Sequence, residues 1–238
     1  MKRRALIIGC PGSGSDFLPG VQADMKNFNS FLQSDRGGRW YSSEIVTLYN
    51  QSKYSIQNAL NQIKREHLDY LLVVFSGHGE YSDQAMCRRL YVDREYIYET
   101  DLRQLCNRQL LILDNCAARD DSVLEKKAEM IFEGLSARNM YRNHRTVFEN
   151  NVMACPPQEI VLYSCDIEEY SSDTTKGGTY SFNLLSQAFN LSHHADVSSL
   201  EAHVAASEVV SRVSMGKQNP QYYCSARRGS KLPIAVGE

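Results

Sequence analysis

The chain has 238 residues, of which 42% are hydrophobic and 23% charged, a composition from which a globular protein can build its own core. A formal net charge of −2 argues against nucleic-acid binding, because almost no excess of cations remains to neutralise phosphates. No apolar run approaches the roughly 18 residues that span a bilayer, so we expect no membrane partner.

Apolar runs alternate with segments of helical periodicity along the whole chain. The apolar runs predict buried strands at residues 4–9, 44–49, 70–75, 109–114 and 160–163, with a last strand at 221–225. The periodic segments predict helices at residues 21–32, 52–66, 179–190 and 198–215. A small hairpin is expected over 89–98, a short helix over 100–107 and another helix starting at Ser122.

This alternation is typical of the α/β class, in which helices cover both faces of a sheet. We predict a three-layer α/β/α sandwich whose central, mostly parallel sheet has about six strands. No repeat or linker divides the sequence, so residues 1–238 are expected to form a single domain. The polar stretch at about 117–158 is predicted to be an inserted, linker-like segment.

The seven cysteines are an odd number, and no two of them form a Cys-x-x-Cys pair. Such a set resembles neither a disulfide framework nor a zinc site. The apolar stretch at residues 5–8 is also too short for the core of a signal peptide. We therefore expect a cytoplasmic protein with reduced thiols and no metal.

Two strand ends carry residues with catalytic chemistry. Ligands of open parallel sheets bind beyond the carboxyl ends of the strands. The run 70–75 leads into the sequence SGHG, which contains His78, and the run 109–114 ends two residues before Cys116. A histidine between two glycines stays accessible, and a cysteine beyond a neighbouring strand can lie within its reach.

A nearby imidazole can convert the thiol to the reactive thiolate. A free cysteine, with a pKa of about 8.5, is only a few per cent thiolate at neutral pH. His78 can accept the proton of Cys116 and later donate it to a leaving amine. The backbone N–H groups of Gly79 and Cys116 are the natural donors to an oxyanion. Either residue alone would more often be inert, and their joint placement favours catalysis.

These motifs resemble those of the caspase-like cysteine peptidases, the caspase/metacaspase superfamily of clan CD. The resemblance is closest to metacaspase-like bacterial members, in which the strand-end Ser-Gly-His-Gly and Asp-x-Cys motifs carry the catalytic dyad. The segments 160–165, 177–182 and 218–223 are also similar to the family pattern. The resemblance implies a caspase-like fold and a thiol protease of the endopeptidase type, a hydrolase in which His78 and Cys116 are catalytic.

Resemblance to metacaspases also implies an acidic primary pocket formed by Asp24, Ser76 and Asp114. Two carboxylates in one slot would attract a basic side chain, with a bidentate geometry that suits arginine. We therefore expect cleavage of a protein or peptide substrate after Arg or Lys. The structural alternative is that Asp24 complements a helix dipole and Asp114 caps a strand end.

Two other functions stay open. One is an Asp-specific, caspase-type peptidase, which the absence of Arg and Lys between Gly9 and Asp24 disfavours. The other is a catalytically idle scaffold or partner-binding module, which would need neither His78 nor Cys116.

The linker-like segment is where this family carries its activation site. Basic residues there are candidates for self-cleavage, and an ordinary solvated helix is the equal alternative. The candidates are Lys127, Arg138, Arg142 and Arg145. We expect regulation by such cleavage or by a protein partner, and similar proteins suggest a role in bacterial defence or cell death.

No cofactor is predicted. Some metacaspases respond to calcium, and carboxylates at residues 120–121 or 166–169 could contribute to such a site. Their spacing does not resemble a dedicated calcium loop.

Overall fold

The computed structural model describes residues 1–115 and 143–238. Its centre is a six-stranded sheet with the order β12-β8-β7-β3-β1-β2. All neighbouring strands are parallel except β12, which pairs antiparallel with β8 at one edge. The strands are β1 (Arg3–Cys10), β2 (Ile45–Tyr49), β3 (Tyr70–Gly77), β7 (Arg108–Asp114), β8 (Gln158–Tyr163) and β12 (Gln221–Cys224). The predicted α/β/α architecture is confirmed.

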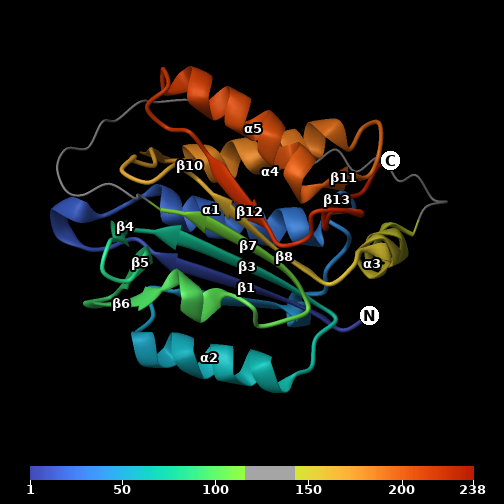
Figure 1. The fold of residues 1–238 in the computed structure, drawn as a ribbon, viewed down its shortest axis with the longest axis horizontal. Helices are drawn as coiled ribbons and strands as arrows, with labels where there is room; N and C mark the ends of the chain where they lie inside the picture. Colours follow the sequence, from blue (N-terminus) through green and yellow to red (C-terminus); the bar gives the residue numbers. More distant parts are fainter. Residues whose placement is uncertain (116–142) are drawn as a thin grey trace.

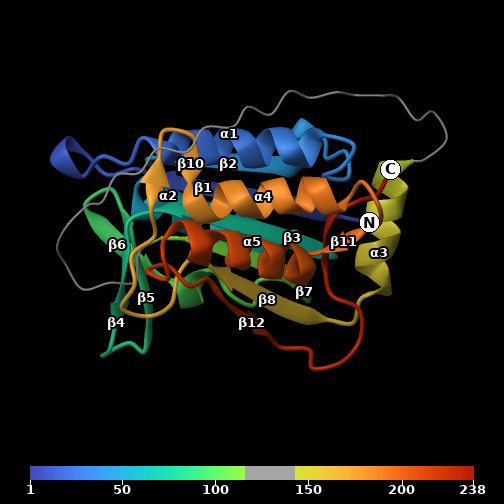
Figure 2. The ribbon, with the colours of Figure 1, turned by 90° about the horizontal axis from the view of Figure 1, so that it is seen from above.

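Helices cover both faces of this sheet (Figure 1). On one face lie α1 (Gly20–Gln33), α4 (Thr179–Leu191) and α5 (Ser199–Val213), which run side by side in Figure 2. On the other face lies α2 (Lys53–Arg65). Each predicted helix among these four is present, with ends that lie within two residues of expectation.

The pleat of β1 shows why residues 5–8 of this strand are all apolar. Ala5 and Ile7 belong to the core beneath α1, α4 and α5, whereas Leu6 and Ile8 belong to the core beneath α2. Successive side chains of a strand point to opposite faces, so a strand covered on both faces needs apolar residues at every position.

The predicted hairpin at 89–98 is present as β5 (Cys87–Val92) and β6 (Glu95–Tyr98). A further strand, β4 (Gly79–Ser82), joins it to form a separate three-stranded sheet, and the Tyr91 N–H donates to the His78 carbonyl. The short helix expected at 100–107 is only a 3₁₀ turn over Glu99–Leu102. The N–H groups of Gln104 and Leu105 donate to the side chains of Glu159 and Gln109 rather than to helical carbonyls, so the helix does not continue.

The latter part of the predicted linker-like segment is ordered and packed. Helix α3 (His144–Ala154) lies near the N-terminus at the amino ends of the strands. Its Phe148 is 1% exposed and contacts the rings of Trp40 and Tyr70. Residues 143–158 are therefore part of the folded core, and the helix expected from Ser122 lies outside the described residues.

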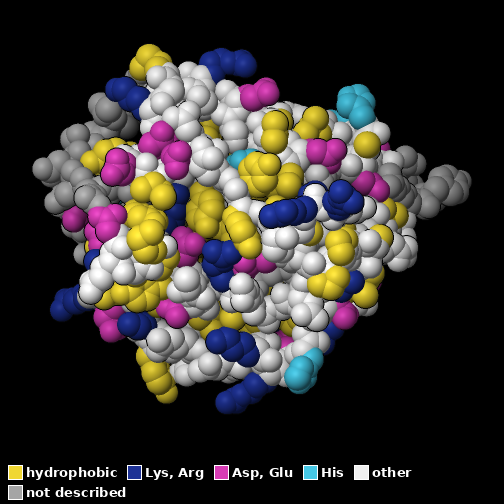
Figure 3. All heavy atoms as spheres, viewed as in Figure 1, with side chains coloured by type: hydrophobic (Ala, Val, Ile, Leu, Met, Phe, Trp, Pro, Cys, Tyr) yellow, Lys and Arg dark blue, Asp and Glu magenta, His cyan; other side chains and the backbone are white. Residues whose placement is uncertain are grey.

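Small strand pairs complete the structure. The hairpin β9 (Asp173–Thr174) and β10 (Gly177–Gly178) precedes α4, and β11 (Val197–Ser198) pairs with β13 (Pro233–Ala235). On the face drawn in Figure 3, Lys and Arg side chains are interspersed with Asp and Glu. None of the helices described is both long enough and apolar enough to cross a bilayer.

Candidate functional site

His78 lies just beyond the carboxyl end of β3, between that strand and β4. The loop that follows β1 lies against it, and the His78 Nε2 atom is hydrogen-bonded to the Asp16 carbonyl oxygen. A carbonyl oxygen can only accept, so Nε2 carries the hydrogen. In the neutral ring, Nδ1 is then the free base.

The strand ends of β3 and β7 meet, as the sequence predicted. Ser76 is the register partner of Asp114 in the parallel β3–β7 pair. A β-carbon added to Gly79 would overlap the side-chain amide of Asn115. The two segments that carry the dyad motifs therefore lie directly beside each other.

Cys116 itself lies outside the described residues, as do Lys127, Arg138 and Arg142. The chain immediately before it is firmly held. Asn115 is 1% exposed, and its backbone N–H donates to the Ser164 Oγ atom at 3.2 Å. Its carbonyl accepts from the Ser164 Oγ at 3.1 Å and from the Cys165 thiol at 3.3 Å.

A buried arginine also holds the chain at Asn115 in place. The guanidinium of Arg88, from β5, donates to the Cys165 carbonyl at 2.6 Å and to the Asn115 carbonyl at 3.5 Å. It also stacks on the Tyr163 ring, 4.7 Å from the ring centre. Arg88 therefore ties the small sheet to the carboxyl end of β7.

The three residues expected to line an acidic pocket do come together. Asp24 is 1% exposed, and its carboxylate accepts from the Ser76 hydroxyl at 2.7 Å and from the Gly178 N–H at 3.0 and 3.1 Å. Asp114 accepts from the Ser171 hydroxyl at 2.6 Å and the Ser181 N–H at 3.0 Å.

Gly178 has to be a glycine in this arrangement. A β-carbon on it would overlap the Asp114 carboxylate, while its N–H donates to Asp24. Absence of a side chain lets the backbone pass between two carboxylates.

A third carboxylate, which sequence reasoning missed, faces the same space. Asp173, in β9, lines one cavity of about 30 Å³ together with Asp24 and Asp114. Burial raises the pKa of Asp173 to about 6, and the charge of Asp114 contributes to the rise. Burial, and then the charge of Asp114, raise the pKa of Asp24 well above its ordinary value. No motif marks Asp173 because the three residues are far apart in sequence.

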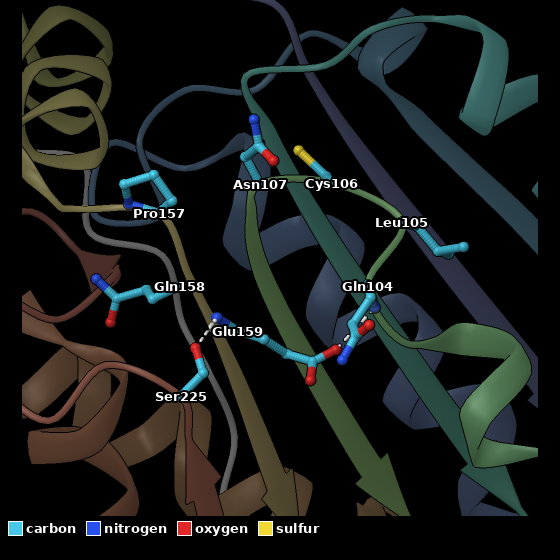
Figure 4. A pocket seen from close by; sticks show the side chains of 8 residues that line it. All are labelled: Gln104, Leu105, Cys106, Asn107, Pro157, Gln158, Glu159 and Ser225. Atoms are coloured by element: carbon cyan, nitrogen blue, oxygen red, sulfur yellow. Dashed lines mark hydrogen bonds between the residues drawn. The ribbon is translucent and has the colours of Figure 1, made fainter.

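A larger hollow, of about 370 Å³, lies elsewhere (Figure 4). Its lining includes Gln104, Cys106 and Gln158, near the amino ends of β7 and β8. His78 lies beyond the carboxyl end of β3, at the opposite end of the parallel strands. Because ligands of open parallel sheets bind beyond the carboxyl ends of the strands, we place the functional site at the smaller cavity.

Arg145 is the one proposed self-cleavage residue in the described part of the chain. It lies in the first turn of α3, and its guanidinium pairs with Glu44 at 2.6 Å and with Glu149 at 3.0 Å. A peptidase needs an accessible, extended segment, so this helical, ion-paired position disfavours cleavage there in the folded protein.

Of the carboxylates considered for calcium, those at 120–121 lie outside the described residues, and one of those at 166–169 has partners within the chain. Glu169 accepts from the backbone and side-chain N–H groups of Asn219 at 2.7 and 2.6 Å. Within residues 1–115 and 143–238, no group of three or more His, Cys, Asp or Glu side chains is placed to hold a metal ion.

Comparison with known proteins gives one family. The family model described as "Caspase domain" matches residues 2–230. Caspase-1 from Spodoptera frugiperda has a similar structure, with a TM-score of 0.64 and 15% identity over 93% of this chain and 88% of that one. A protein from Geobacter sulfurreducens matches with the same TM-score and identity over 100% of both chains. No curated protein sequence matches significantly.

Proposed function

Because the chain belongs to the caspase-domain family of caspase-like cysteine peptidases, we propose that it is an endopeptidase that cleaves protein chains after arginine or lysine. His78 and Cys116 form the catalytic dyad in this proposal. The cavity lined by Asp24, Ser76 and Asp114 receives the basic side chain.

The hydrogen bond to Asp16 supports a particular role for each of the two imidazole nitrogens. Nε2 donates to the Asp16 carbonyl, so Nδ1 takes the thiol proton of Cys116. The thiolate attacks the scissile carbonyl, and the resulting oxyanion is stabilised by the N–H groups of Gly79 and Cys116. Proton transfer from His78 to the amine releases it and leaves an acyl-enzyme, which water activated by the same imidazole hydrolyses.

One observation carries the specificity. Asp24 and Asp114 are 1% and 5% exposed, and the described residues that line their cavity include no Lys or Arg. Buried carboxylates without a countercharge are unfavourable, and a substrate guanidinium or ammonium would supply that charge. The cavity of about 30 Å³ has room for roughly two water molecules, so it must widen as the side chain enters.

Purified protein should be incubated with fluorogenic peptides that end in Arg, Lys or Asp, beside a Cys116→Ala variant. We expect turnover of the Arg and Lys peptides only, and none by the variant. Turnover of the Asp peptide alone would refute the basic pocket. An Arg-ended electrophilic peptide that labels Cys116, and loses this labelling in His78→Ala, would separate an enzyme from an idle scaffold.

Regulation belongs to the same proposal. Cleavage after Lys127, Arg138 or Arg142, or the binding of a protein partner, would control when this cytoplasmic peptidase is active. Incubation of active protein with the Cys116→Ala variant, followed by mass spectrometry, tests whether one molecule cuts another at these residues.

A further inference from the structure

Asp173 lies at the outer part of the carboxylate cavity. It is only half-buried, whereas Asp24 and Asp114 are buried. One of its carboxylate oxygens, Oδ2, accepts the N–H of Gly20, the first residue of α1, at 3.0 Å. Helix α1 has no side-chain cap of its own at Pro19, so a structural role for Asp173 as a remote cap is the simple alternative.

The charges around the cavity indicate a role for Asp173 other than helix capping. Three aspartates, from α1, β7 and β9, line it together with hydroxyl, backbone and apolar groups, and its described lining has no cationic side chain. A cap needs only an acceptor oxygen, which asparagine supplies as well as aspartate. A third negative charge raises the pKa of its neighbour Asp24. The electrostatic cost of these charges is relieved by a bound proton or by a cation that enters the cavity, and a basic side chain of a substrate is such a cation.

We propose that Asp173 is a specificity-determining residue, whose carboxylate contacts the basic side chain of the substrate at the mouth of the pocket. This inference rests on the proposed function and extends it, because it adds a third acceptor for a guanidinium. A guanidinium has five donors in a planar fork, so it can bond to several carboxylates at once.

The test uses the full chain with Cys116→Ala, which removes turnover, and the probe N-acetyl-arginine amide. Binding is followed by ¹⁵N NMR at two backbone amides, Gly178, which donates to Asp24, and Gly20, which donates to Asp173. We expect both resonances to move with the same Kd. Asp173→Asn, which retains an oxygen for Gly20, should raise this Kd about tenfold or more, because a charge-assisted bond is lost.

Asp93→Asn is the matched control. Asp93 is exposed in the turn between β5 and β6, with a φ of 52° that asparagine also adopts readily. The substitution removes one negative charge without touching the cavity, so the Kd of the probe for this variant should stay within about twofold of the parent value.

The outcomes are distinct. If Asp173→Asn binds the probe as tightly as the parent, or if Gly178 responds and Gly20 does not, the role of Asp173 is refuted and the basic pocket stands. The second readout needs no substitution at Asp173, so it holds even if that variant folds poorly. If the probe does not bind the parent and arginyl peptides are not cleaved, the basic pocket itself is refuted, and the inference falls with it.

Discussion

Two glycines in the loop after β1 allow the role of His78 to be tested with a matched pair of substitutions. Gly12 and Gly14 have φ values of 75° and 65°, so alanine at either position costs about 1–2 kcal/mol of backbone strain. A β-carbon on Gly14 would have no atom within 4 Å, whereas one on Gly12 would lie 2.8 Å from the His78 Nε2 and 2.9 Å from the Asp16 carbonyl oxygen. Only the change at Gly12 therefore pushes the ring and its acceptor apart.

The expected effects follow from these distances. Both variants should lose about 1–2 kcal/mol of unfolding free energy, a fall in melting temperature of roughly 2–8 °C for a chain of this size. Gly12→Ala should also lower kcat about 100-fold, since a displacement of about 1 Å in a catalytic group can cost that much, while Gly14→Ala should keep kcat within about threefold. Peptidase kinetics and thermal unfolding measure both. Equal kcat values for the two variants would refute the assignment of His78 as a base oriented through Asp16.

Three further predictions concern buried groups. Burial and a neighbouring carboxylate raise the pKa of Asp24, so the contribution of this group to stability is full below the unfolded pKa of about 3.9 and is lost as pH rises through the folded pKa. Asp24→Asn should therefore stabilise the fold against denaturant at pH 8 but not at pH 3. The same variant should lower kcat/KM for an arginyl peptide about 10- to 100-fold. Burial lowers the pKa of His203 to about 4, so at this residue only the unfolded chain gains a proton between pH 6.5 and 4, and His203 contributes a fall of about 3 kcal/mol in the unfolding free energy across that range. Asp173, whose pKa is raised to about 6, contributes in the opposite direction over the same range, so the measurement is the difference in unfolding free energy between the parent and His203→Gln, which should change by about 3 kcal/mol between pH 6.5 and 4. Arg88→Met should cost about 1–3 kcal/mol in denaturant unfolding and reduce kcat, because the Asn115 carbonyl loses a donor. Arg89→Met is the matched control: Arg89 is half-buried and pairs with Glu80 at 3.0 Å, so this change should cost much less stability than Arg88→Met and leave kcat near the parent value.

The sequence predicted the sheet well because its central strands, β1, β3, β7 and β8, are buried on both faces. Runs such as 70–75 and 110–113 are apolar at every position, and a parallel sheet covered on both faces favours that pattern. Strand β4 has no such signal, since Gly79–Ser82 is half-polar and is held by pairing with β5. Helix α3 was missed because its sequence is mostly polar. It is fixed instead by a few contacts, above all those of Phe148 with Trp40 and Tyr70.

The site was predictable only where a motif is contiguous. His78 stands in a four-residue motif at the end of an apolar run, and the structure places it beyond β3 beside the end of β7, while Cys116 stays a prediction. Asp24 and Asp114 were found through family resemblance. Asp173 belongs to no local pattern, because its closeness to them depends on where the hairpin β9–β10 packs against α1. Long-range packing of this kind has no period that a sequence window can detect.

The fold holds three carboxylates together because helix ends supply partial positive charge. The N–H of Gly20 begins α1, and those of Gly178 and Ser181 lie at the N-cap and in the first turn of α4. Each donates to one of the three aspartates, and the amino end of a helix carries roughly half a positive charge. Two such ends compensate part of the negative charge without filling the cavity, as a lysine or arginine would. In the proposed function, a basic side chain of the substrate would meet the remainder, so the backbone donors would hold the three carboxylates together without occupying the space that the substrate needs.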